Sequence, residues 1–128
     1  MTFKIISTPN APAAIGPYSQ GIAYNGMIQT SGQVALDPQT GQMVGNGDIT
    51  AETKQVMANL FAILKAAGTT PDKIGKTTIF LADMKDFATM NEIYGAALGE
   101  HRPARSTVQA AALPKGARVE IEALAMLG

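Results

Sequence analysis

The sequence contains no cysteine and no tryptophan, and its only histidine is His101. Without cysteine the chain can form no disulfide, no cysteine nucleophile and no thiolate metal site. A single histidine argues against a Ser-His-Asp hydrolase and against a zinc site with several histidine ligands. We therefore expect no metal site. The cysteine-free composition is also compatible with the cytoplasmic location that we expect.

Charged residues are scarce as well, at 16% of the chain against about 25% in an average soluble protein. Ten Lys and Arg residues balance ten Asp and Glu residues, so the net charge is zero. A protein that binds nucleic acid through its phosphates normally has a basic excess, so we do not expect a nucleic-acid partner. A surface with few charges leaves more apolar area in contact with water, which favours self-association.

Long apolar segments are also missing. The strongly apolar stretch at 57–64 is interrupted by Asn59 and is too short to span a bilayer, and the first residues lack the hydrophobic stretch of a signal peptide. No G-x-G-x-x-G or Walker lysine motif indicates a nucleotide site. The sequence thus predicts neither a membrane partner nor a phosphate-binding loop.

The 128 residues are enough for one core, and we expect a single domain over 1–128. Asn25-Gly26 between two strand-like runs predicts a hairpin, because both central residues of its tight turn need a positive φ. Three prolines between Thr8 and Ser19 predict a long structured loop. Alternation and helical periodicity predict strands at 3–6, 21–24, 27–33, 76–81, 105–110 and 117–126, and helices at 49–67 and 86–98.

This order, β-β-β-α-β-α-β-β, predicts an α+β fold in which two helices cover one face of a sheet. In the last strand Val119 and Ile121 share one face, while Glu120 and Glu122 share the other. The second face of the sheet must be covered too. In a chain with so few charges we expect another copy of the chain to cover it.

Two kinds of charged side chain could carry chemistry. The guanidinium of Arg105, at the start of a predicted strand, suits a two-point grip on a carboxylate, although a surface salt bridge is the commoner role of an arginine. Glu120 or Glu122 could be a partly buried base. Both could equally be solvated acids or partners of Arg118.

Four uncharged residues could shape a pocket. Tyr18 could orient a ligand through its hydroxyl, or it could anchor the loop. Ser31 and Gly32 could supply a hydroxyl and a backbone N–H, or they could simply be small residues of a strand. Asn91 shares a predicted helix face with Phe87, where an amide packs or caps more often than it binds a ligand. Taken one at a time, none of these residues requires a functional role.

Taken together, however, the motifs resemble the RidA/YjgF family from end to end. The segments that carry the resemblance are, in order, APAAIGPYSQG at 11–21, TSGQ at 30–33, PARS at 103–106, LPKG at 113–116 and VEIEA at 119–123. Because Tyr18, Ser31, Arg105 and Glu120 are all present, the chain is similar to the deaminase-competent RidA branch.

The resemblance implies a chorismate-mutase-like fold, with a mixed six-stranded sheet backed by two helices. It also implies a homotrimer with a site at each subunit interface. The implied activity is hydrolysis of reactive 2-imino acids, 2-iminobutanoate and 2-iminopropanoate, to 2-oxo acids and ammonia without a cofactor. Pyridoxal-phosphate enzymes such as threonine dehydratase release these imines, and hydrolysis would prevent imine and enamine damage.

The resemblance also implies roles for individual residues. Arg105 would bind the substrate carboxylate, and Glu120 would direct the water. Further residues would shape the pocket or contact the ligand: Tyr18, Ser31, Gly32, Phe87, Asn91 and Thr107.

Two departures from the family pattern concern the site. Many relatives carry cysteine where this chain has Thr107, and there only the backbone N–H is expected to matter. The segment 100–103 is shorter than in many members, and Arg102 replaces an aromatic residue. We expect Arg102 to be solvated or to lie at the rim of the site. The shortened segment would affect the size of the substrate that the site accepts.

Two other functions stay open from the sequence. The same pocket could belong to a non-catalytic module that binds a 2-oxo acid or a similar metabolite. Some family relatives have also been linked to RNA cleavage or to chaperone-like binding of proteins. Zero net charge and few aromatic residues argue against an RNA enzyme, and the presence of both Arg105 and Glu120 favours the deaminase.

Overall fold

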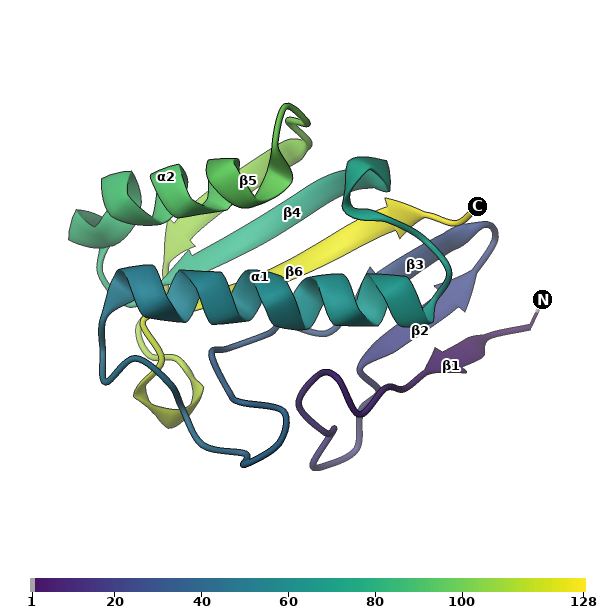
Figure 1. Ribbon diagram of the computed structural model, residues 1–128, viewed down its shortest axis with the longest axis horizontal. Coiled ribbons are helices and arrows are strands. Elements are labelled where there is room, and N and C mark those ends of the chain that lie inside the picture. Colours follow the sequence, from purple (N-terminus) through teal and green to yellow (C-terminus); the bar gives the residue numbers. More distant parts are fainter. Residues whose placement is uncertain (1) are drawn as a thin grey trace.

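Two helices lie on one face of a six-stranded sheet in the computed structural model, which describes residues 2–128 (Figure 1). The strands are β1 (Lys4–Ile6), β2 (Gly21–Tyr24), β3 (Met27–Thr30), β4 (Ile74–Leu81), β5 (Ala104–Gln109) and β6 (Val119–Met126). The helices are α1 (Ile49–Ala66) and α2 (Phe87–Leu98), and short 3-10 helices cover Pro71–Lys73, Met84–Asp86 and Pro114–Gly116. The mixed sheet with two helices on one face that the sequence predicted is confirmed.

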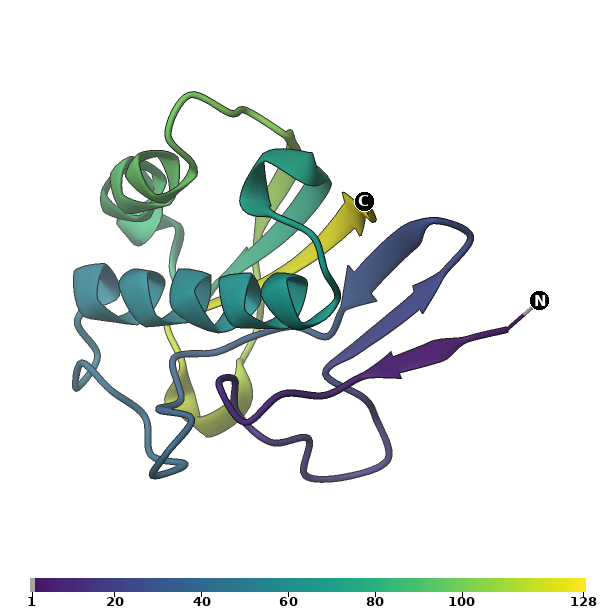
Figure 2. The ribbon, with the colours of Figure 1, turned by 45° about the vertical axis from the view of Figure 1, so that its right-hand side comes forward.

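The strand order across the sheet is β1-β2-β3-β6-β4-β5. Every neighbouring pair is antiparallel except β4 and β5, which run parallel. Helix α1 connects β3 to β4, and α2 connects β4 to β5, so each helix crosses over the same face of the sheet (Figure 2). The C-terminal strand β6 therefore lies in the middle of the sheet, between β3 and β4.

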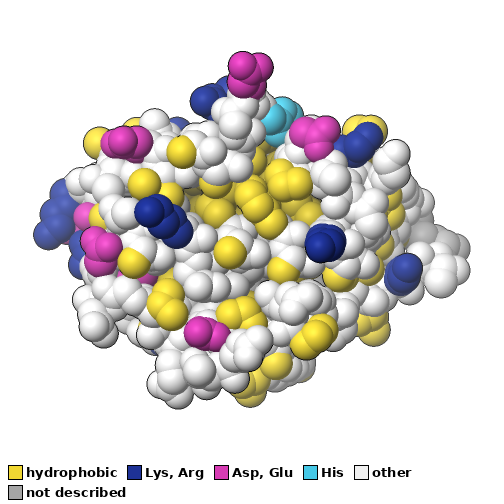
Figure 3. Space-filling model, in the orientation of Figure 1, with side chains coloured by type: hydrophobic (Ala, Val, Ile, Leu, Met, Phe, Trp, Pro, Cys, Tyr) yellow, Lys and Arg dark blue, Asp and Glu magenta, His cyan; other side chains and the backbone are white. Residues whose placement is uncertain are grey.

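The long helix α1 follows from local signals. Asp48 caps it, because its side chain accepts a hydrogen bond from the Ala51 N–H at 3.0 Å. Its apolar stripe, including Val56 and Leu60, is buried against the sheet. Figure 3 shows further apolar side chains gathered on this side of the molecule, over the two helices. Within residues 2–128, no helix is both long and apolar enough to cross a membrane.

The strand expected at 27–33 is wrong beyond Thr30. The Ser31 N–H still donates to the carbonyl of Gln20 at 2.9 Å, in register with β2. The pairing with β6 is interrupted, because the Ala123 N–H donates to the side-chain Oγ1 of Thr30 at 3.0 Å. Gln33 returns to the sheet through one isolated bridge to Ile121. The other predicted elements differ from the structure by one or two residues at their ends.

The sheet has one covered face and one bare face. Along β6 the side chains of Val119, Ile121, Ala123 and Ala125 are buried under the helices. The strand registers put a set of half-buried or exposed apolar side chains on the other side, which we call the bare face: Ile5, Ile22, Phe80, Val108, Leu124 and Met126. Two of these, Ile5 and Met126, are more than 60% exposed, and an apolar surface of this kind favours association.

Arg118 joins the start of β6 to both helices. Its backbone N–H donates to Glu52 Oε1 of α1 at 2.9 Å. Its guanidinium donates to Asp86 Oδ2, just before α2, from Nε at 3.0 Å and from Nη2 at 2.5 Å. Arg118 thus pairs with Asp86, which excludes the pairing with Glu120 or Glu122 that the sequence left open.

Glu52 is 1% exposed, and this burial raises the pKa of its carboxyl above the usual value.

The substitution Glu52→Gln tests the cost of this buried charge. Glutamine keeps an oxygen for the Arg118 N–H but cannot ionise. Because the folded-state pKa of Glu52 is raised, its contribution to the free energy of unfolding falls as the pH rises from below its ordinary 4.5 through the raised value. We expect Glu52→Gln to gain stability relative to the unmodified protein as the pH rises above about 4.5. Urea denaturation at a fixed protein concentration measures this difference, and a difference independent of pH would contradict the assignment.

Candidate active site

The residues that the sequence singled out divide between the two faces of the sheet. Thr107 lies opposite Ile79 of β4, whose side chain is buried under the helices. Arg105, two residues earlier on β5, shares that covered face. Glu120 lies opposite Phe80, on the bare face. One copy of the chain therefore holds Arg105 and Glu120 on opposite sides of its sheet.

On the covered face, the Arg105 guanidinium is held by α2. Its Nη1 donates to Asn91 Oδ1, and its central carbon lies 5.4 Å from the ring centres of both Phe87 and Tyr94. Within residues 2–128 Arg105 forms no ion pair, so the alternative of a surface salt bridge does not hold there. An amide and two aromatic rings orient a guanidinium without neutralising it, so its charge stays available for an anion.

Tyr94 is a part of this arrangement that the sequence analysis did not assign. Its hydroxyl forms a buried hydrogen bond with Thr77 Oγ1 on β4, at 2.7 Å, which fixes the ring beside Arg105. The signal was present, because Tyr94 follows Asn91 by three residues and therefore lies on the same helix face. What the spacing could not supply was the strand that this face meets.

A cavity of about 470 Å³ opens beside Arg105, within the size range of small-molecule sites. It is lined by Asn91, Tyr94, Gly95, Arg102, Pro103 and Arg105. Farther along β5, the Thr107 Oγ1 is buried and has no hydrogen-bond partner among the residues that the structure describes. A buried hydroxyl without a partner is uncommon in folded proteins.

On the bare face, the Glu120 carboxylate lies against the backbone of Gly32. A Cβ atom at Gly32 would lie 2.1 Å from Glu120 Oε2 and 2.8 Å from its Cδ, so only glycine leaves room for the acid. Burial raises the pKa of the Glu120 carboxyl, and the negative charge of Glu122 raises it further. A raised pKa makes Glu120 a stronger proton acceptor than an ordinary glutamate.

Ser31 precedes Gly32 in the chain, and a hydrogen bond links it to the loop that contains Tyr18. Ser31 Oγ donates to the carbonyl of Ser19 at 2.5 Å, which ties the strand end to the proline-rich loop. Tyr18, the residue before Ser19 in that loop, is 53% exposed. The structure therefore places Gly32 against Glu120, with Ser31 next to Gly32 in the chain, and connects Tyr18 to Ser31 only through the loop.

Gln20 holds that loop in place, and the sequence analysis missed it. Its side chain is almost fully buried and makes four hydrogen bonds to the loop backbone. Oε1 accepts from the Thr8 N–H, and Nε2 donates to the carbonyls of Thr8, Ala11 and Pro12. No local pattern could have indicated this role, because the partners lie eight to twelve residues away.

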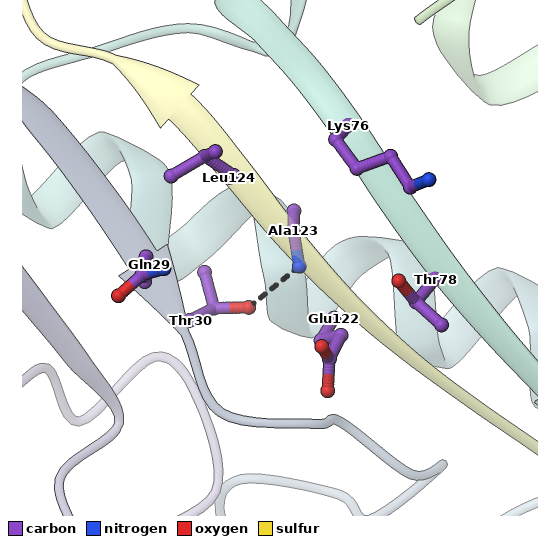
Figure 4. Close-up of a pocket in the computed structure, with 7 residues that line it drawn as sticks. All are labelled: Gln29, Thr30, Lys76, Thr78, Glu122, Ala123 and Leu124. Atoms are coloured by element: carbon purple, nitrogen blue, oxygen red, sulfur yellow. Dashed lines mark hydrogen bonds between the residues drawn. The ribbon is translucent and has the colours of Figure 1, made fainter. Parts of the chain in front are cut away.

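A second groove, of about 380 Å³, lies on the bare face between β3, β6 and β4 (Figure 4). It is lined by Gln29, Thr30, Lys76, Thr78, Glu122, Ala123 and Leu124. Thr30 Oγ1 accepts a hydrogen bond from the Ala123 N–H there, at 3.0 Å. Glu122 lines this groove, whereas Glu120 lies beside Gly32, so the structure separates the two acids that the sequence could not rank.

The candidate site uses arginine, carboxylate and hydroxyl groups. The part of the chain that the structure describes brings together no group of three or more His, Asp or Glu side chains that could hold a metal ion. A guanidinium free to bind an anion and a carboxylate with raised proton affinity are the parts needed to hold an acid and activate water.

Known proteins resemble this chain over nearly its whole length. Residues 8–127 match the family model described as Endoribonuclease L-PSP. The chain is 54% identical to the 2-iminobutanoate/2-iminopropanoate deaminase of Mus musculus, over 98% of this chain and 92% of that protein. The solved structure of the Rid-family protein YyfA from Yersinia pestis is 50% identical and superposes with a TM-score of 0.96 over 98% of this chain and all of that one. Escherichia coli TdcF, solved with bound serine, is 44% identical with a TM-score of 0.92, over 98% of this chain and 99% of that one.

Proposed function

The chain belongs to the endoribonuclease L-PSP family, also called RidA/YjgF, and from this we propose that it hydrolyses reactive 2-imino acids. The substrates would be 2-iminobutanoate and 2-iminopropanoate, and the products a 2-oxo acid and ammonia. The proposal is carried by one observation, which is that Arg105 keeps a free charge while Glu120 has a raised pKa beside Gly32. We place the reaction in the cytoplasm, in keeping with the cysteine-free sequence.

The substrate must contact both Arg105 and Glu120, and one copy of the chain holds these two residues on opposite faces of its sheet. We therefore propose a homotrimer in which bare faces pack together and a site forms at each interface. Because β5 is an edge strand of its sheet, Arg105 of one copy would reach Glu120 and Gly32 of the next copy round that edge. The apolar side chains of the bare face support this packing, because their exposure in a single copy is unfavourable.

The first step would be capture of the substrate by its carboxylate. A guanidinium presents two parallel N–H donors that match the two carboxylate oxygens. Asn91 and the rings of Phe87 and Tyr94 hold Arg105 in place before the substrate arrives. Binding of the substrate carboxylate to Arg105 then orients the imine carbon toward the water.

The second step would be attack of water on the imine carbon. The protonated imine is already electrophilic, so the protein must only place the water and take its proton. Glu120 would accept that proton as the water oxygen bonds to carbon and the C=N electrons move to nitrogen. The Glu120 carboxyl would then return the proton to the nitrogen of this carbinolamine. As the C–N bond breaks and ammonia leaves, the hydroxyl oxygen would form the C=O bond of the 2-oxo acid and give its proton to the Glu120 carboxylate. General base assistance of this kind contributes roughly 10²–10⁴ in rate.

The remaining residues would shape the site around these two. Gly32 leaves the room that Glu120 occupies, and the backbone N–H groups of Gly32 and Thr107 would face the ligand. Tyr18 and Ser31 would supply hydroxyl groups from the loop side. The zero net charge and the small cavity beside Arg105 favour a small acid over RNA, and the raised pKa of Glu120 favours a catalyst over a passive binding module.

Substitution of Arg105 tests the carboxylate grip. Arg105→Lys keeps the charge but replaces the two-pronged donor with a point charge, so we expect it to lose most of the imine hydrolysis. Arg105→Ala should also abolish binding of 2-oxobutanoate, because each charged hydrogen bond contributes about 1.5–3 kcal/mol and a bidentate pair makes two. The assay adds the protein to a threonine dehydratase reaction and follows oxo-acid release with semicarbazide. Lys65→Ala, which removes an exposed cation of α1, is the control, and full activity of Arg105→Ala would overturn the assignment.

Substitution of the two glutamates tests the base. Glu120→Gln should lower the rate by about 10² or more, with folding and assembly intact. Glu122→Gln keeps the base but removes a neighbouring negative charge, so the pKa of Glu120 should fall. Because the base acts in its ionised form, the acid limb of the kcat/KM profile should then move to lower pH. Equal losses from the two variants, or an unmoved profile for Glu122→Gln, would show that the base is misassigned.

A further inference from the structure

The cavity beside Arg105 contains a second guanidinium, that of Arg102. Its Nη1 donates to the carbonyls of Gly99 at 2.7 Å and His101 at 2.9 Å, at the C-terminal end of α2. These bonds hold the side chain, while Nη2 faces Gly95. Neither arginine of this cavity forms an ion pair with a carboxylate in residues 2–128. The cavity therefore contains two fixed positive charges and no acid that compensates them.

Gly95 keeps the space between these charges and α2 open. It lies inside the helix, where glycine is less favourable than alanine. A Cβ at this position would meet only Arg102 Nη2, at 3.8 Å, which is an ordinary contact. Neither the backbone nor packing therefore requires glycine here. The consequence of Gly95 is free volume next to the Arg102 guanidinium, in the cavity that Arg105 also lines.

We propose that this cavity receives the side-chain carboxylate of a dicarboxylic 2-imino acid. Arg105 binds the carboxylate next to the imine carbon, and Arg102 binds the distal one through Nη2. The substrates are the imines of aspartate and glutamate, 2-iminosuccinate and 2-iminoglutarate. Arg102 is thus a specificity-determining residue, and the inference rests on the proposed function and names its substrate class.

The chemistry of the two charges supports this class. A dicarboxylate can bind one guanidinium group with each of its two carboxylates. The side chain of 2-iminobutanoate is apolar and ends in a methyl group, so it forms no favourable interaction with the charge of Arg102. A cavity of about 470 Å³ has room for a four- or five-carbon diacid. The bonds from Arg102 Nη1 to backbone carbonyls fix the guanidinium in advance, which lowers the entropy lost on binding.

The test compares two substrates on four proteins. Amino-acid oxidases generate 2-iminosuccinate from aspartate and 2-iminobutanoate from 2-aminobutanoate, and the accelerated release of the oxo acid is followed for each. We expect the unmodified protein to hydrolyse both imines. In Arg102→Ala the ratio of kcat/KM for 2-iminosuccinate to that for 2-iminobutanoate should fall by about ten- to a hundredfold, the range that one charged hydrogen bond supplies. Gly95→Leu, which fills the cavity and keeps Arg102, should lower the ratio in the same direction, while Lys65→Ala should leave it unchanged.

A binding measurement separates this inference from the proposed function. By titration calorimetry, oxaloacetate should bind the unmodified protein more tightly than 2-oxobutanoate, and Arg102→Ala should remove that preference. This result would support the dicarboxylate site even if neither imine were hydrolysed. Hydrolysis of 2-iminobutanoate without 2-iminosuccinate, or a ratio unchanged in both Arg102→Ala and Gly95→Leu, would overturn the inference and leave the proposed function standing.

Discussion

The register of β6 between β3 and β4 governs the rest of this structure. Side chains alternate along a strand, so Ile121 packs under the helices while Glu120 points to the bare face. A shift by one residue would bury the two glutamates and expose the core. The same ladder continues through β4 to β5 and places Arg105 on the covered face. The two charged groups of the candidate site are thus divided by the sheet in each copy, and contact between copies is what can bring them to one substrate.

The helix that orients the Arg105 guanidinium is tied to the same strand. Arg118, just before β6, binds Asp86, and α2 begins one residue later at Phe87. From there α2 offers an amide and two aromatic rings to the Arg105 guanidinium. The amide and the rings position the guanidinium and leave its charge unpaired. A carboxylate in their place would neutralise that charge. The packing that stabilises the fold therefore also fixes the position of the Arg105 guanidinium.

The parts of the fold that depend on neighbouring residues could be predicted from the sequence. The helix at 49–67 followed from its periodicity, and the hairpin followed from Asn25-Gly26, whose φ angles of 50° and 73° fit the expected turn. The strand end at Thr30 could not be predicted, because there the Thr30 side chain accepts the N–H of Ala123 on β6, a residue far away in the sequence. The division of Arg105 from Glu120 was also beyond the sequence, since strand order decides which face each side chain takes.

Mixing two inactive variants tests most directly whether each site combines two copies. Arg105→Ala and Glu120→Ala would be unfolded, combined and refolded, and mixed trimers identified by native mass spectrometry. Random mixing in a ring of three places an intact Arg105 beside an intact Glu120 of the next copy at about a quarter of the sites. Our account predicts that hydrolysis of 2-iminobutanoate recovers toward that fraction while each variant alone stays inactive. Mixed trimers as inactive as either parent would contradict it.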